Sequence, residues 1–151
     1  MITAGTLLEA VKSHALASGL FDKVNGAEPK SAPPATGITA AVWVQTLRPV
    51  QASGLNTTSF LFSVSVRLYA SALADPPDMI DPTVMAAADV LLNAYTGDFT
   101  LDGLVESIDL LGRHSDGLGG EAGYVAIDGL MQRVFTITVP MIVHNVYVQE
   151  P

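Results

Sequence analysis

Residues 59–69 read SFLFSVSVRLY and carry the clearest strand pattern in the chain. Successive side chains of a strand point to opposite faces of a sheet, so alternate residues should share one environment. One alternating set is wholly apolar: Phe60, Phe62, Val64, Val66 and Leu68. The other set mixes apolar residues with Ser63, Ser65 and Arg67. We therefore expect a sheet with one face in a core and one mixed face.

The residues before this strand predict a helix and then a loop. Thr6 and Glu9 have the spacing of a capping box, and Gly19 is a typical C-terminal stop, so we expect a helix between them. Residues 25–37 contain three prolines and predict an extended loop.

A second strand is expected after this loop. Residues 39–47, TAAVWVQTL, are rich in residues with high β-propensity. The polar residues 49–58 then predict a long hairpin connection with one apolar tip, Leu55.

The residues after the central strand predict another helix. Asp81 and Pro82 form an N-cap and first-turn pair, and Gly97 follows the expected end. One stripe at helical spacing is apolar: Val84, Ala88, Leu91 and Tyr95. Residues 104–111 predict a further strand, and residues 112–123, which contain several glycines, predict a flexible loop.

The C-terminal part predicts a hairpin. Residues 124–127 and 130–139 flank Asp128-Gly129, a favoured type I′ turn pair. Pro140 has no N–H, so we expect the remainder to be an edge strand or an exit from the sheet.

The whole chain predicts one α+β domain over residues 1–151. Its 151 residues fit a single domain. Two helices and about five strands, joined largely by hairpins, predict a mainly antiparallel sheet with the helices packed on it.

The composition predicts a subunit with a partly covered surface. Charged residues make up 15% of the chain, against about 25% in an average soluble domain. A surface so poor in charge is typical of a chain covered by copies of itself or by partners, although a monomer with alanine-rich helices is an alternative.

The charge and the cysteine count exclude several function classes. The net charge is -8, and eleven acidic residues but only one basic residue, Arg113, lie between Asp75 and Asp128. Such a chain is a poor binder of nucleic-acid phosphates. Without cysteine there are no disulfides, thiolate zinc sites or cysteine nucleophiles. The start of the chain lacks a signal-peptide pattern and no apolar run approaches 18 residues, so we expect synthesis in the cytoplasm and no membrane span.

No motif predicts an enzyme. The glycine run at residues 117–122 fits a relaxed dinucleotide-binding pattern, but a strand-like segment follows it where a helix is required. His14, His114 and His144 have no metal-ligand spacing, and we expect neither a metal nor a cofactor. Paired acids such as Asp98 with Asp102 define no pocket by themselves.

Two arginines lie inside otherwise apolar strands. Arg67 and Arg133 are therefore candidates for ion pairs with Asp109 or Glu106, either within the subunit or across an interface.

Eight short segments follow one another along nearly the whole chain. They are FDKVNGAEPK at 21–30, AAVWVQ at 40–45, SGL at 53–55, VSVRLYA at 64–70, IDP at 80–82, YTGDF at 95–99, IDLLG at 108–112 and GYVAIDG at 123–129. This order resembles tail terminator proteins of long-tailed (siphovirus-type) bacteriophages, as in phages that infect actinobacteria.

The resemblance implies a structural virion protein. Members of that family form a hexameric ring on the head-proximal end of the tail tube, stop its polymerisation and offer a surface to head-completion proteins. It implies as partners further copies of this chain, the major tail tube protein, a head-completion or neck protein, and double-stranded DNA that passes through without specific binding. A neck or head-tail joining protein and, in another class, a small-ligand binding module remain alternatives.

Two sets of residues are candidates for these contacts. The loops at residues 49–58 and 112–123 suggest partner contacts at Leu55, Asn56, Leu118 and Glu121. Asp98 and Asp102 are candidates for the lumen of the ring, where carboxylates would repel DNA phosphates.

Overall fold

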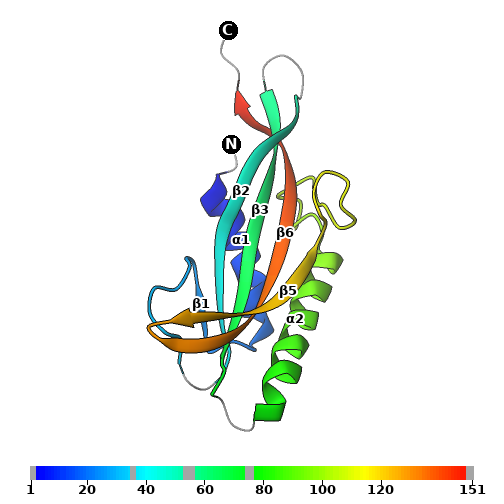
Figure 1. Ribbon diagram of the computed structural model, residues 1–151. Helices are drawn as coiled ribbons and strands as arrows, with labels where there is room; N and C mark the ends of the chain where they lie inside the picture. Colours follow the sequence, from blue (N-terminus) through cyan, green and yellow to red (C-terminus); the bar gives the residue numbers. More distant parts are fainter. Residues whose placement is uncertain (1–2, 35–36, 53–56, 74–76, 149–151) are drawn as a thin grey trace.

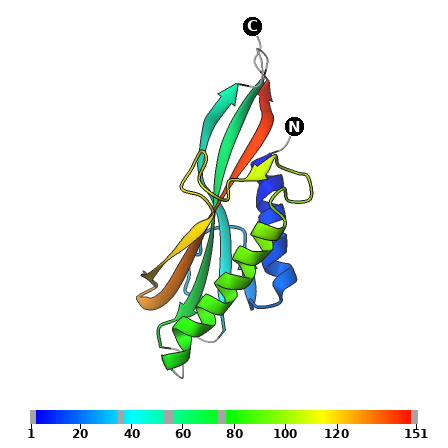
Figure 2. The same ribbon diagram turned by 90° about the vertical axis from the view of Figure 1, so that its right-hand side faces the viewer.

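The computed structural model describes residues 3–34, 37–52, 57–73 and 77–148. Two helices lie on one side of a strongly curled sheet, as Figures 1 and 2 show from two directions. In chain order the elements are α1 (Ala4–Ser18), β1 (Lys23–Asn25), β2 (Thr39–Ala52), β3 (Thr57–Ser71), the short 3₁₀ turn η1 (Pro77–Met79), α2 (Ile80–Gly97), β4 (Ser107–Ile108), β5 (Gly119–Ile127) and β6 (Leu130–Val148). The α+β class predicted from the sequence is confirmed.

The sheet of the described residues has six strands. Its order is β1-β2-β3-β6-β4, and β5 also pairs with β6. All pairings are antiparallel except that of β1 with β2, which is parallel. The sheet is therefore mixed rather than purely antiparallel.

The hairpin of β2 and β3 is longer than expected. The prediction of a loop over residues 49–58 is wrong, because residues 49–52 and 57–58 belong to the two strands and Ala52 pairs with Thr58. Two register shifts, between Val44 and Thr46 and between Pro49 and Gln51, accommodate this polar sequence in the ladder. Leu55 lies outside the described residues.

β6 runs through Pro140, against the expectation of an edge or an exit. Pro140 pairs with Ser63 of β3, and its carbonyl oxygen accepts a hydrogen bond of 2.8 Å from the N–H of Asp109 on the other side. Because the N–H and C=O of a strand residue point to the same side, the missing donor faces the gap between β4 and β5. The ladder to β3 therefore loses nothing.

Both helices begin differently from the prediction. The N-cap of α1 is Thr3, whose hydroxyl accepts from the N–H of Thr6, so the expected capping box at Thr6 is wrong. The N-cap of α2 is Met79 without a side-chain hydrogen bond, and Asp81 lies in the first turn. The expected stop at Gly19 is confirmed, with a left-handed φ of 69°.

The main core lies between the helices and the sheet. The α2 stripe expected from the sequence is buried there, as are Leu7, Val11 and Ala15 of α1. Beneath them lie the apolar alternate residues of β3, including Phe62, Val64, Val66 and Leu68. The Tyr95 hydroxyl donates a 2.9 Å hydrogen bond to the Val11 carbonyl and joins the two helices.

The hairpin of β5 and β6 curls over the opposite face of the sheet (Figure 2). The expected turn is confirmed, since Asp128 and Gly129 have φ values of 52° and 75°. The prediction of a loop over residues 112–123 is wrong for residues 119–123, because β5 begins at Gly119. A small second core lies beneath this curl: Ala41, Tyr69 and Val134, packed by Trp43, Val125 and Ile127.

The strand expected at residues 104–111 shrinks to β4, Ser107–Ile108. Two register pairs, Ser107 with Ile142 and Ile108 with Met141, attach it to β6. After β4 the Asp109 carboxylate accepts hydrogen bonds from the N–H groups of Arg113 and His114, which hold the chain in a turn.

Candidate functional site

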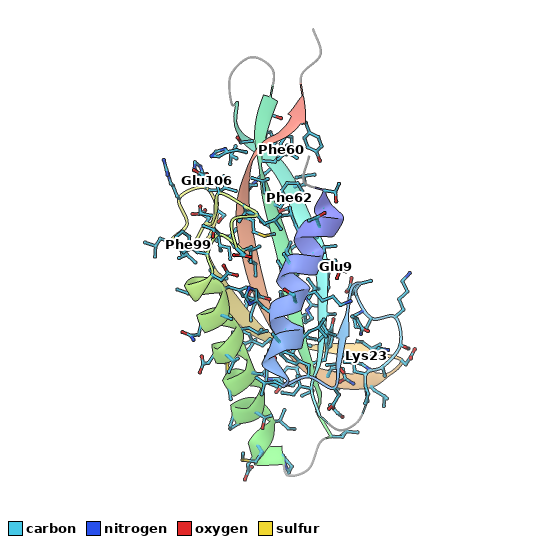
Figure 3. The ribbon with its side chains drawn as sticks, turned by 180° about the vertical axis from the view of Figure 1, so that it is seen from behind. Glu9, Lys23, Phe60, Phe62, Phe99 and Glu106 are labelled. Carbon is cyan, nitrogen blue, oxygen red and sulfur yellow. The ribbon has the colours of Figure 1, made fainter. Side chains whose placement is uncertain are left out.

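Three polar side chains form a hydrogen-bonded chain beside the projecting end of the sheet. The Ser59 Oγ lies 2.6 Å from Nδ1 of His144, and Nε2 of His144 lies 2.8 Å from Oε2 of Glu106. β3 positions Ser59, β6 positions His144, and Glu106 directly precedes β4. Figure 3 shows Glu106 beyond the end of α2. A serine, a histidine and a carboxylate in series are the components of a hydrolytic triad, so access to the serine matters.

The burial of Ser59 argues against nucleophilic catalysis. A cavity of about 250 Å³ is lined by Ser59 itself together with Glu106, Arg113, His114 and His144, yet Ser59 is 0% exposed. A nucleophile has to reach the substrate, and this hydroxyl oxygen has no exposed surface. The geometry favours a structural link that ties β3, β6 and the β4 segment together.

Asp109 organises the loop that follows β4. Its carboxylate accepts hydrogen bonds from the N–H of Arg113 (2.7 Å), the N–H of His114 (2.8 Å) and the hydroxyl of Ser115 (2.8 Å). Burial by itself raises the pKa of Asp109, but these hydrogen bonds outweigh burial and hold the pKa below its ordinary value. The loop is thus wound around an ionised carboxylate.

Arg67 lies in a cleft on the sheet face away from the helices. The cleft measures about 540 Å³ and is lined by Gln45, Asp116, Thr136, Thr138 and part of β5, including Glu121. Arg67 Nε donates to Thr136 Oγ1 at 2.8 Å, and the guanidinium lies 5.3 Å from the centre of the Trp43 ring. Burial raises the pKa of nearby Tyr69, and the positive charge of Arg67 opposes that rise.

Arg133 reaches the opposite face and contacts α2. Its Nε donates to Oδ1 of Asp81 at 2.9 Å, and its guanidinium stacks 4.4 Å from the ring centre of Tyr124. Within the subunit, the expected pairing of Arg67 or Arg133 with Asp109 or Glu106 does not form, and pairing across an interface stays a prediction. The two arginines occupy opposite faces of the sheet, backbone N–H groups hold Asp109, and His144 holds Glu106.

The two lumen candidates have different environments. Asp98 Oδ2 lies 2.9 Å from Nε2 of His14, and its Oδ1 accepts from the N–H of Asp102. The carboxylate of Asp98 therefore joins α1 to the end of α2. Asp102 is exposed and has a left-handed φ of 58°.

Of the four candidates for partner contacts, the two that are described differ in how exposed they are. Leu118 is half-buried and packs against the main core, so it is less available than expected from a loop tip. Glu121 is exposed on β5 and lines the cleft. Leu55 and Asn56 lie outside the described residues.

Exposed apolar side chains gather at both ends of the sheet. Leu47, 42% exposed, and Tyr147, 41% exposed, lie on the end that projects past the helices. Tyr124, Leu130 and Met131, all more than 45% exposed, lie on the β5–β6 hairpin at the other end (Figure 1). Large exposed apolar side chains that gather in this way are typical of contact surfaces.

Sequence reasoning did not find the link of Ser59, Glu106 and His144. Its members are far apart along the chain, Ser59 and His144 by 85 positions, and no local spacing connects them. The pairing of β3 with β6 brings Ser59 to His144, and the attachment of the β4 segment to β6 brings Glu106 to them. Asp81 and Arg133, which are 52 positions apart, likewise have no local spacing that connects them.

Two further properties concern the described residues alone. They contain no group of three or more histidine, aspartate or glutamate side chains arranged to hold a metal ion. Neither helix combines the length and the apolar character needed to cross a membrane.

Comparison with known proteins adds no relative to this picture. No family model matches the sequence, and no curated protein matches it.

Proposed function

We propose that this chain is a non-catalytic virion protein that closes the head-proximal end of a phage tail tube as a ring and joins tail to head. The carrying observation is that exposed apolar side chains lie at opposite ends of one charge-poor subunit, with Leu47 and Tyr147 at one end and Tyr124, Leu130 and Met131 at the other. A ring requires two different contact surfaces on each subunit, because its interface is heterologous and repeats by rotation. The segment order that resembles tail terminators supports the same role.

The burial of Ser59 supports the non-catalytic part of this proposal. The Ser59, His144 and Glu106 link lies where the projecting end of the sheet leaves the helices, and it would stiffen that end for assembly. Mechanical support of this kind suits a protein that carries load between head and tail.

The acidic surface fits passage of DNA through the ring. With a net charge of -8 per subunit, a ring of six copies repels phosphates over roughly 8 Å at physiological salt. Asp102 is the better lumen candidate, because Asp98 is held by His14. We expect Asp102→Lys to leave the fold intact and to slow genome passage, whereas Asp98→Lys would also loosen the contact between the helices.

The decisive experiment combines assembly with tube growth. Purified protein is examined by native mass spectrometry and electron microscopy, and then added to the polymerising tail tube protein of the same genome. We expect six-membered rings at one end of each tube, and tubes that stop growing. Tubes that grow on unchanged would contradict the proposal, and binding to the head-side connector alone would indicate the neck protein instead.

A further inference from the structure

The end of the β2–β3 hairpin projects from the body of the molecule. We call residues 46–52 of β2 and 57–60 of β3 the arm. Figures 1 and 3 show that it extends past both helices, with Phe60 beyond their ends. Residues 46–49 are exposed, including the apolar Leu47. β6 pairs with β3 along the arm, but the exposed side chains of β2 in the arm lie past the helices, so a partner surface that covers them would stabilise the arm.

The arm is positively charged in an acidic protein. Arg48 is its one charged residue, and it is exposed. Within the described residues Arg48 forms no ion pair. The arm therefore presents an unpaired cation on a chain whose net charge is -8.

The cleft beside β5 carries negative charge, opposite in sign to the charge of the arm. Asp116 and Glu121 are both exposed at its lining, and neither forms an ion pair within the part of the chain that is described. Its one cation, Arg67, is already engaged by Thr136 and Trp43. The cleft therefore suits a cationic partner.

Both surfaces also present unpaired strand edges. Among the described residues β5 pairs only with β6, so its second edge is open there over Gly119–Ile127. β1 covers β2 at Thr39–Ala41, and no other strand of the described ranges pairs with the outer edge of β2 in the arm. The arm edge is interrupted by Pro49 and by two register shifts, features that suppress indiscriminate pairing. Recognition therefore depends on side chains as well as on the backbone.

We propose that the arm of one copy lies in the cleft of the next copy, with Arg48 facing Asp116 and Glu121 along the open edge of β5. This inference rests on the proposed ring and names its interface. A second copy is the occupant that the charges favour, because the same chain carries the cationic arm and the acidic cleft at different places. Such a head-to-tail contact, repeated by rotation, closes a ring.

A charge-swap experiment tests this contact. Arg48→Glu and Glu121→Lys each place like charges against one another, and we expect each to weaken ring assembly at least about tenfold by native mass spectrometry and sedimentation. The double variant Arg48→Glu/Glu121→Lys restores opposite charges and should recover assembly. Lys23→Glu and Glu9→Lys, at exposed positions outside both surfaces (Figure 3), are the matched controls and should assemble normally.

The outcomes separate this contact from the ring itself. Wild-type rings that are insensitive to both single substitutions, or that the double variant fails to restore, overturn the arm-in-cleft contact and leave the ring standing. A wild-type chain that stays monomeric at every concentration and on the tube overturns both. Circular dichroism melting of every variant verifies that the exposed substitutions leave the fold intact.

Discussion

The two faces of the sheet differ in what fills them. The face toward α1 and α2 carries one continuous apolar core, with the alternate β3 residues from Phe62 to Leu68 at its centre. The opposite face carries a second core of three buried residues and, beside it, a cleft with Arg67, Gln45 and threonines. Hydrophobic burial therefore concentrates on one face, while the other is free to carry polar contacts. The sheet therefore separates the large core that stabilises the fold from the polar cleft.

The strongest test of this division truncates one side chain on each face. Leu68→Ala removes a fully buried residue from the helix-side core and should lower the free energy of unfolding by about 2–5 kcal/mol. Ile127→Ala, on the half-buried second core, should cost clearly less. Urea unfolding measures both, and equal losses would contradict the division.

Asp109→Asn tests the loop on the less apolar side. Asparagine retains one acceptor oxygen and should lose about 1.5–3 kcal/mol for each hydrogen bond to the carboxylate that breaks. The pKa of Asp109 is lowered in the folded state, so its contribution is present above the ordinary pKa of about 3.9 and is lost as the pH falls through the lower folded value. Unfolding at pH 7 and pH 3 should therefore show a smaller pH dependence in the variant. Asp102→Asn, at an exposed carboxylate, is the control, and an unchanged pH dependence in Asp109→Asn would refute the role of this carboxylate.

Two glycines of β5 test how tightly this strand packs against β6. A Cβ at Gly120 would overlap the Phe135 ring and lie 2.9 Å from the Thr136 carbonyl oxygen. Gly120→Ala should therefore cost about 1–3 kcal/mol through overpacking. A Cβ at Gly123 meets nothing closer than 3.8 Å, so Gly123→Ala should be nearly neutral. Thermal melting compares the two, and a Gly120→Ala protein as stable as Gly123→Ala would show that β5 packs less tightly.

The smallest effect is expected at Tyr95. Tyr95→Phe keeps the ring in the core but removes the hydrogen bond to the Val11 carbonyl, at a cost of about 0.5–1.5 kcal/mol. Burial raises the pKa of Tyr95, so its hydroxyl stays protonated and able to donate. Unfolding at pH 7 measures the loss, and a variant as stable as the parent would mean that the bond contributes nothing net.

Local patterns predicted the elements where one physical requirement decides the structure. The alternation at residues 59–69, the apolar stripe of α2 and the Asp128-Gly129 turn were all confirmed, because period and turn chemistry are properties of neighbouring residues. The prediction of a loop at residues 49–58 was wrong, because polar residues join a strand ladder when an extended partner strand lies beside them. The prediction that the chain leaves the sheet or forms an edge at Pro140 was wrong for a related reason. Only the pairing on both sides of β6 shows that the missing N–H of Pro140 does not face β3.

The amino-acid sequence alone determined the α+β class, the shortage of charge, the excess of acidic residues and the segments that resemble tail terminators. Which groups meet depends on the fold of the whole chain: Asp81 contacts Arg133, Glu106 contacts His144, and Asp109 contacts the backbone of its own loop. The tertiary structure also placed Arg48 in the arm part of β2 and Glu121 in the lining of a cleft. The reason is separation along the chain: periodicity and turns depend on residues a few positions apart, whereas these contacts depend on strand register and curl across the whole sheet.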